Sequence, residues 1–168
     1  MVRGRGKGRS VNGIILLDKA KGESSNYALQ RIKRLFRAKK AGHTGSLDPL
    51  ATGVLPLCLG EATKISQFLL DSDKRYIAKV KLGERTDSGD SEGVIIEVQR
   101  RIDVDYETLV QTLTKFEGEI KQLPPMYSAL KHHGVPLYKL ARKGISIKRK
   151  VRAVTIHKIG LMNFDNNI

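Results

Sequence analysis

The sequence predicts an α+β domain with a mixed, largely antiparallel sheet flanked by helices. Short apolar segments typical of strands are mixed with amphipathic segments typical of helices. They do not follow the regular strand–helix–strand order of a doubly wound parallel sheet. The chain of 168 residues, 40% of them hydrophobic, is long enough to bury a core. We therefore expect one ordinary globular domain without internal repeats.

Strands are predicted where apolar or alternating segments are bounded by turn residues. These segments are 13–18, which we expect to be buried, 54–59, 74–82, 94–99, 126–131 and 151–161. Helices are predicted over residues 24–37, 61–70, 105–116 and 137–143. Ser24, Ser25 and Asn26 supply capping side chains for the first helix. Its expected core face carries Ala28, Ile32, Leu35 and Phe36, and that of the second carries Ala62, Ile65, Phe68 and Leu69.

The net charge indicates the kind of partner. Lysines and arginines number 31 against 17 acidic residues, which gives a formal charge of +14. Such an excess favours a polyanion, and nucleic acid is the better candidate than an anionic membrane, because no helix has a large apolar face with aromatic residues. No apolar run is long enough to span a bilayer, and no signal-type apolar core follows the N-terminal cations. We expect a cytoplasmic protein.

Three segments concentrate the positive charge. Residues 1–12 are predicted to be a flexible basic arm, either a disordered solubilising tail or an arm that contacts phosphates. The helix over 24–37 and the residues after it carry six cations and no acid between positions 31 and 40, which favours a phosphate-binding surface over a plain solvated face: Arg31, Lys33, Arg34, Arg37, Lys39 and Lys40. Residues 120–164 contain no acid and include Arg142 and Lys143, so we expect them to face a polyanion.

Several familiar sites are excluded by pattern. A single cysteine, Cys58, permits no intramolecular disulfide or cysteine-rich zinc site, and its apolar surroundings predict a buried side chain. The four histidines lack the spacing of a helical zinc site. No phosphate-binding loop, dinucleotide fingerprint or hydrolase nucleophile elbow occurs.

The segment 42–53, GHTGSLDPLATG, is predicted to be a shaped loop that carries one acid, Asp48. One interpretation is structural: an aspartate before Pro49 commonly starts a turn in which its carboxylate accepts backbone N–H groups. The other is functional: Gly45 and Gly53 let the backbone approach a ligand, and Pro49 stiffens the position of a carboxylate that acts as a nucleophile or base toward a nucleic-acid component. Composition alone leaves both interpretations open.

The order of the residues carries a resemblance. The run GHTGSLDPLATGVLP at 42–56, followed by GEATK at 60–64, closely resembles the signature of the TruB family of tRNA pseudouridine synthases. The resemblance extends upstream to LDKAKGESSN at 17–26 and downstream to DKRY at 73–76 and PPMYSALK at 124–131, and so covers nearly the whole chain from about Asn12.

The resemblance implies a pseudouridine synthase-like catalytic domain and an isomerase that converts the T-loop uridine at tRNA position 55 to pseudouridine. It implies no cofactor, no metal and no protein partner, and a monomer whose substrate is the T-arm of tRNA. Asp48 matches the family's essential aspartate, which attacks the flipped nucleotide or stabilises the departing base. The resemblance gives Tyr76 the role of stacking on the target base, His43 that of aiding base flipping, and Lys19 and Lys74 positions near the site.

The chain also departs from the family pattern. Lys19-Ala20 stands where the family usually has Lys-Pro, which we expect to loosen the turn. The sequence ends before the arginine motif that pairs with the catalytic aspartate and before the RNA-binding PUA domain. We therefore expect residues 13–168 to be a partial catalytic domain that binds RNA weakly and has little activity alone. The alternatives are a non-catalytic RNA-binding or RNA-folding module and, less favoured, the snoRNA-guided synthase of archaea and eukaryotes.

Overall fold

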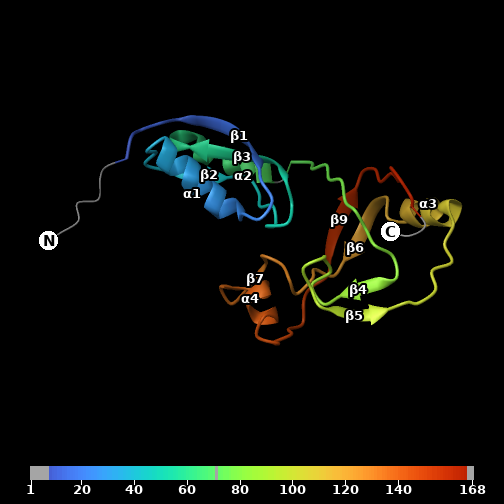
Figure 1. Ribbon diagram of the computed structural model, residues 1–168. Helices are drawn as coiled ribbons and strands as arrows, with labels where there is room; N and C mark the ends of the chain where they lie inside the picture. Colours follow the sequence, from blue (N-terminus) through green and yellow to red (C-terminus); the bar gives the residue numbers. More distant parts are fainter. Residues whose placement is uncertain (1–7, 71, 166–168) are drawn as a thin grey trace. The chain divides into compact units, whose positions relative to one another are not determined.

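The structure, a computed structural model, describes residues 8–70 and 72–165. The chain forms two compact units, Met1–Tyr76 (unit 1) and Ile77–Ile168 (unit 2), and each is described by itself (Figure 1). All strand pairs within the described sheets are antiparallel, as predicted, and a lone parallel bridge joins Arg9 to Ala38.

Unit 1 is built on a three-stranded sheet in the order β1-β3-β2. The strand β3, Gly53–Leu59, is central and pairs along its whole length with β1, Gly13–Lys19. The short strand β2, Ala41–His43, pairs with the second half of β3. The predicted strands 13–18 and 54–59 are thus confirmed, and β2 was not predicted because its residues were assigned to the loop.

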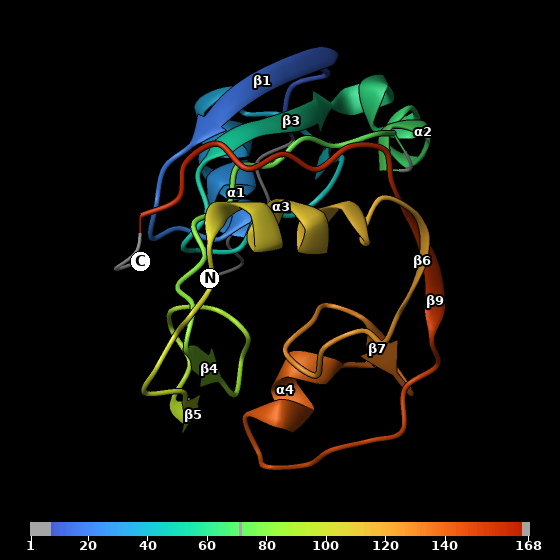
Figure 2. The same cartoon turned by 90° about the vertical axis from the view of Figure 1, so that its right-hand side faces the viewer.

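The helix α1, Ser25–Leu35, covers one face of this sheet (Figures 1 and 2). Ser24 caps its N-terminus, because the Ser24 hydroxyl accepts a hydrogen bond from Tyr27 N. At the other end Ala38 N donates to Lys33 O and Arg37 N to Arg34 O, with Arg37 at a φ of 51°. This is a Schellman end in which an arginine occupies the left-handed position that usually takes glycine.

The core of unit 1 lies between α1 and β3. Its buried members are Ala28, Leu29, Leu55 and Leu57, and Leu47 of the loop packs against them. Burying an aliphatic side chain of this kind contributes about 1.5–3 kcal/mol. The buried Leu29 was not among the residues expected in the core.

Several expected core positions of unit 1 are exposed. Leu35 and Phe36 point outward at the end of α1, and Ile14 and Leu16 are exposed on β1, so the first strand is not the buried strand expected. The reason is geometric: α1 covers only one face of the sheet, and alternate residues of β1 lie on the other.

The predicted helix 61–70 is divided. A 3₁₀ helix, η1 (Gly60–Lys64), precedes the one-turn helix α2 (Ser66–Leu70), and Phe68, expected to face inward, is exposed. Thr63 and Ser66 hydroxyls donate to main-chain carbonyls three residues back, at Gly60 and Thr63, and such local bonds compete with regular helix.

Of the predicted basic arm, residues 1–12, only residues 8–12 belong to the described part of the chain. Arg9 N donates to Arg37 O at 2.7 Å and Arg9 O accepts from Lys39 N at 3.0 Å. The Asn12 side chain accepts from Glu61 N at 2.9 Å. Residues 8–12 are therefore bonded to the rest of unit 1, and the prediction of a flexible arm otherwise concerns residues outside the described ranges.

Unit 2 consists of small antiparallel pairs and two helices. The paired strands are β4 (Glu84–Thr86) with β5 (Ile95–Val98), β6 (Gly118–Gln122) with β9 (Arg152–Ile156), and β7 (Lys131–His132) with β8 (Val135–Pro136). The helices are α3 (Tyr106–Thr114), capped by Asp105, and α4 (Leu137–Ala141). Figure 2 shows these pairs as separate ribbons.

Two predicted strands of this part of the chain are wrong. Residues 74–82 form no strand, although their alternation is that of one, and of the predicted strand 126–131 only Lys131 lies in a strand, β7. A strand requires a neighbour to accept its main-chain hydrogen bonds, and the described residues offer none there. Among the described large apolar residues of unit 2, only Leu137 is fully buried, so this unit has little core of its own.

Candidate functional site

The predicted acid-bearing loop connects β2 to β3 in unit 1. The loop proper is 44–52, shorter than the 42–53 predicted from composition. Gly42 and His43 pair with Cys58 and Leu57 of β3, and Gly53 pairs with Lys19 of β1. Gly42 and Gly53 were predicted to belong to the loop because glycine is common in turns, but in the structure both pair with neighbouring strands of the sheet.

A tight turn presents Asp48. The turn is closed by a hydrogen bond from Ala51 N to Asp48 O at 3.0 Å, with Pro49 in the second position, where its fixed φ suits such a turn. The Asp48 side chain is exposed, and no described residue hydrogen-bonds or ion-pairs with its carboxylate. The turn is therefore closed by the main chain, and the side-chain turn of the structural interpretation is not formed.

The segment between β1 and α1 holds the loop on both sides of Asp48. The Ser25 hydroxyl accepts a hydrogen bond from Leu47 N at 2.8 Å and donates one to Leu47 O at 3.0 Å. Gly22 N donates to Pro49 O at 2.7 Å. The residues before and after Asp48 are thus both bonded to residues 22–25, and the acid lies between two fixed points.

Lys19 lies inside the turn that supplies these contacts. Its side chain is 0% exposed, and its ammonium donates to Ala20 O at 2.9 Å and to Glu23 O at 2.8 Å. The resemblance implied a position for Lys19 near bound substrate. In the structure its charge is directed at main-chain carbonyls, and its visible function is to fix the turn that carries Gly22.

His43 lies at the point where β2 enters the loop. It is half-buried, and its Nδ1 is a buried atom with no hydrogen-bond partner among the described residues. An unpaired buried nitrogen is uncommon in folded proteins and costs free energy. The next residue, Thr44, is buried and its N–H donates to Pro56 O at 3.2 Å, which ties the start of the loop to β3.

Tyr76 and Lys74 lie after α2, outside the loop. The Tyr76 side chain is 68% exposed, and the ammonium of Lys74 donates to Leu70 O at 2.6 Å and Ser72 O at 2.7 Å. Within the described chain, no hydrogen bond or ring contact joins either residue to Asp48. The structure therefore brings Lys19 to the Asp48 loop through the turn, but does not bring these two residues to it.

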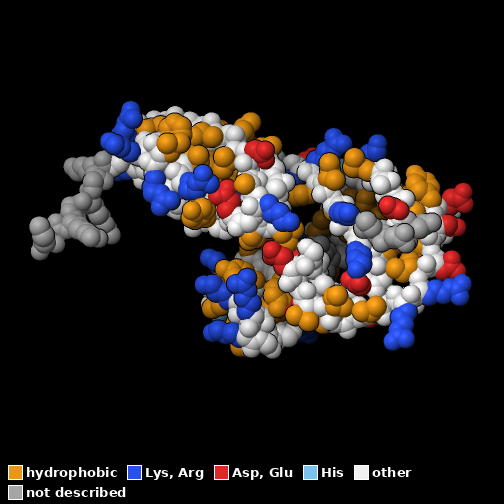
Figure 3. Space-filling view, viewed as in Figure 1, with side chains coloured by type: hydrophobic (Ala, Val, Ile, Leu, Met, Phe, Trp, Pro, Cys, Tyr) orange, Lys and Arg blue, Asp and Glu red, His pale blue; other side chains and the backbone are white. Residues whose placement is uncertain are grey.

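The cations of α1 differ in how free they are. Arg31 pairs with Glu23 at 3.1 Å, and the Glu23 side chain is largely buried. Lys33 is half-buried, and the remaining four predicted phosphate-binding cations are exposed, with no ion pair recorded among described residues: Arg34, Arg37, Lys39 and Lys40. A hollow of about 530 Å³ lies beside Arg31 and Arg34, between α1 and the end of β1. Figure 3 shows Lys and Arg side chains over α1.

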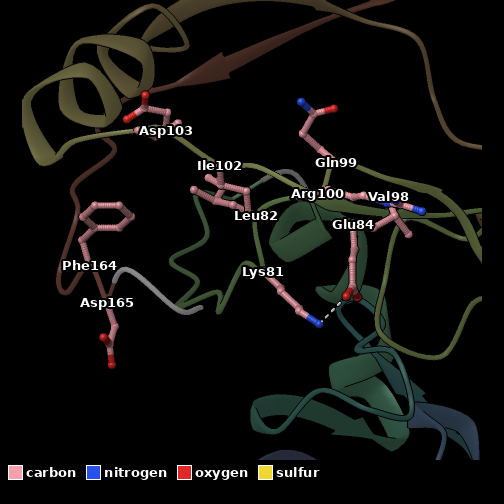
Figure 4. A pocket seen from close by; sticks show the side chains of 12 residues that line it. Lys81, Leu82, Glu84, Val98, Gln99, Arg100, Ile102, Asp103, Phe164 and Asp165 are labelled. Atoms are coloured by element: carbon pink, nitrogen blue, oxygen red, sulfur yellow. Dashed lines mark hydrogen bonds and ion pairs between the residues drawn. The ribbon is translucent and has the colours of Figure 1, made fainter.

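The predicted cations of unit 2 lie at the end of α4. The Arg142 guanidinium stacks over the Tyr138 ring, 5.5 Å from its centre, and Lys143 is exposed. Figure 3 shows basic side chains gathered over the β7–α4 region. Unit 2 also has a hollow of about 470 Å³ between the base of the β4–β5 hairpin and Phe164, where Lys81 pairs with Glu84 (Figure 4). None of the predicted site residues lines it.

Among the described residues, no three His, Cys, Asp or Glu side chains lie close enough to hold a metal ion. Cys58 is buried as predicted, and burial raises the pKa of its thiol. Within the described ranges, no helix is both long and apolar enough to cross a bilayer.

The sequence reasoning missed Ser25 and Gly22 as residues of the site. Ser25 was assigned to helix capping together with Ser24. One signal was available: a single residue caps a helix N-terminus, so the second of two adjacent serines needs another partner for its hydroxyl. The partner, 22 residues along the chain, could not be predicted from local pattern.

Comparison with known proteins finds relatives along most of the chain. A family model described as "TruB family pseudouridylate synthase (N terminal domain)" matches residues 33–168. The relative named tRNA pseudouridine synthase B of Psychromonas ingrahamii is 60% identical over 163 residues, which is 97% of this chain and 52% of the relative. A protein of the same name from Vibrio cholerae is 59% identical over 167 residues, 99% of this chain and 53% of the relative. The chain thus spans about half the length of these relatives.

A solved structure agrees with the predicted fold class. One chain of the structure described as "Crystal Structure of a Cbf5-Nop10-Gar1 Complex" superposes with a TM-score of 0.57 at 27% identity. The match covers 91% of this chain and 36% of that one. The α+β prediction is confirmed.

Proposed function

Because this chain belongs to the TruB family of pseudouridylate synthases, we propose that the protein isomerises a uridine in the T-loop of tRNA, at position 55, to pseudouridine. The N-glycosidic bond between N1 and the ribose breaks, the uracil turns, and a bond from C5 to the ribose forms, while C5 loses its proton and N1 gains one. The relatives that carry the name tRNA pseudouridine synthase B support both the reaction and the substrate.

The observation that carries the proposal is the state of Asp48. Its carboxylate is exposed, unpaired among the described residues, and borne on a turn fixed at both neighbouring residues. A carboxylate engaged in closing its own turn would not be free to react. One held by its main chain alone is available to attack the ribose of a flipped nucleotide or to stabilise the departing base.

The remaining residues take supporting roles. His43, at the entrance of the loop with its ring nitrogen Nδ1 unpaired, aids the flipping of the base, and the exposed ring of Tyr76 stacks on it. Stacking on an aromatic side chain returns about 1–3 kcal/mol of the cost of unstacking the base. Lys74 lies near the substrate, whereas Lys19 acts through the turn. The exposed cations at the end of α1 and in the residues that follow α1 and α4 contact tRNA phosphates: Arg34, Arg37, Lys39, Lys40, Arg142 and Lys143, with Arg31 as a weaker member.

We place the protein among the stand-alone synthases of bacteria, acting as a monomer in the cytoplasm without cofactor, metal or protein partner. The segments LPLCLG at 55–60 and GEATK at 60–64 favour this form over the RNA-guided one. Nop10 and Gar1 belong to the complex that contains the structural relative.

The test is the variant Asp48→Asn in the complete gene product that carries this sequence. We expect pseudouridine formation in a tRNA transcript to fall by on the order of 10⁴-fold or more, while tRNA affinity stays within about twofold. Asp103→Asn is the matched control: it makes the same charge change at a side chain that is 89% exposed in unit 2, and should be fully active. Activity in Asp48→Asn equal to that of the control would refute the assignment.

A non-catalytic RNA-binding or RNA-folding module is the alternative function, favoured by the charge of +14. The same assay separates the two. The module is favoured if the parent protein forms no pseudouridine and if Asp48→Asn refolds tRNA as well as the parent does. Because the chain spans about half the length of its relatives, we expect these 168 residues by themselves to bind tRNA weakly and to turn over little, and turnover equal to that of a full-length relative would contradict this expectation.

A further inference from the structure

We propose that Ser25 is a positioning residue for Asp48, and that its hydroxyl holds the main chain from which the carboxylate extends. This inference rests on the proposed function, because the quantity that Ser25 controls is the geometry of the catalytic carboxylate. The evidence is the pattern of contacts on both sides of Asp48 and the absence of described contacts to its side chain.

The Ser25 hydroxyl is fully committed to one residue of the loop. The side chain is 4% exposed, accepts from Leu47 N at 2.8 Å and donates to Leu47 O at 3.0 Å. A serine hydroxyl has one donor, and here that donor and an acceptor lone pair are both used on the main chain of Leu47. The helix does not need this hydroxyl for capping, because Ser24 supplies the cap.

Two further contacts hold the loop together with the Ser25–Leu47 pair. Leu47 also packs against the buried cluster of unit 1, so its side chain and its main chain are both held. On the far side of Asp48, Gly22 N holds Pro49 O at 2.7 Å. Two residues fixed to one segment leave the main chain of Asp48 little freedom to rotate.

The side chain of Asp48 has no such support. No described residue hydrogen-bonds to its carboxylate, so the main chain of residues 47–49 alone fixes where its Cα–Cβ bond lies and points. Loss of the Ser25 hydroxyl would release one of its two fixed points. A displacement of about 1 Å in a reacting group can lower a rate by on the order of 10²-fold without affecting binding.

The experiment compares Ser25→Ala with Ser24→Ala in the complete protein. Both variants remove one serine hydroxyl from the start of α1, but the hydrogen bond recorded for the Ser24 hydroxyl is to Tyr27 N within the helix, not to the Asp48 loop. The measurements are the single-turnover rate of pseudouridine formation and the dissociation constant for tRNA. We expect Ser25→Ala to lower the rate by about 10- to 100-fold with affinity within about twofold, and Ser24→Ala to keep the parent rate.

Two further measurements separate positioning from a loss of folding. Hydrogen exchange of the Leu47 amide should accelerate in Ser25→Ala while the amides of β3 keep their protection. Ser25→Thr, which retains the hydroxyl, should recover both the slow exchange and much of the rate.

Each outcome decides the inference. Equal rates for the two alanine variants, or a Leu47 amide equally protected in Ser25→Ala, would overturn it. If the parent protein makes no pseudouridine, the proposed function fails and so does the catalytic role of Ser25, while the exchange data still show whether Ser25 holds Leu47.

Discussion

The burial of Lys19 leads to a prediction that separates a structural role from a substrate-binding one. The variant is Lys19→Met, which keeps an unbranched apolar stem of similar length and removes the ammonium. In the structure that ammonium satisfies two main-chain carbonyls, Ala20 O and Glu23 O, and the lysine side chain itself is fully buried.

The magnitude follows from those two contacts. A buried carbonyl left without a partner costs about 1–3 kcal/mol, so two of them cost about 2–6 kcal/mol. Removing a buried charge returns part of this, because the ammonium no longer has to be taken out of water. We therefore expect the free energy of unfolding of unit 1 to fall by about 2–4 kcal/mol, an estimate that combines both effects.

The assay is urea denaturation of the complete protein, followed by amide exchange in β1 and β3 so that unit 1 is monitored by itself. The matched control is Lys21→Met, which removes the same charge from an exposed position of the same turn. At temperatures where Lys19→Met is folded, its tRNA affinity and the dependence of that affinity on salt should equal those of the parent.

A phosphate contact would give the opposite result. If Lys19 touched RNA, Lys19→Met would lower the slope of log affinity against log salt by about 0.7–0.9 and leave the unfolding free energy near that of the control. That outcome would refute the structural role derived from the two carbonyls.

Two more predictions concern unit 1. Arg34→Gln should reduce tRNA affinity and its salt slope more than Arg31→Gln does, as measured by filter binding at several salt concentrations, because Arg31 is engaged by Glu23 and Arg34 has no described partner; equal effects would show that the ion pair opens at no cost when RNA binds. Cys58 should react with a thiol reagent only as fast as unit 1 unfolds, because it is fully buried and burial raises its thiol pKa; rapid reaction in the native protein near neutral pH would contradict the burial.

The sequence predicted well those features that depend on neighbouring residues. The ends of α1 and α3 follow from Ser24 and Asp105, whose caps are formed as local chemistry requires. The turn at Asp48 follows from Pro49 in the same way. The expected function came from the family resemblance, because the order of many residues is far more specific than any single short motif.

Features that depend on distant residues could not be predicted. Whether 74–82 forms a strand depends on a partner strand, which alternation in one segment cannot reveal. Leu35 and Phe36 satisfy the helical period but extend beyond the area of sheet that α1 covers. Lysine is usually a surface residue, and only the fold shows that the Lys19 ammonium donates to two main-chain carbonyls.

The Asp48 loop connects stability to chemistry through Leu47. The side chain of this residue packs on the core formed by Ala28, Leu29 and two leucines of β3, while its main chain is held by Ser25, which begins the same helix. A shift of α1 on the sheet would therefore move both supports of Leu47 together, and the peptide that carries Asp48 with them. Because protein interiors are close-packed and hardly compressible, the position of the Asp48 main chain depends on the packing of this core. The exposed loop would thus hold the main chain of the proposed catalytic residue at a defined position, although no described side chain contacts its carboxylate.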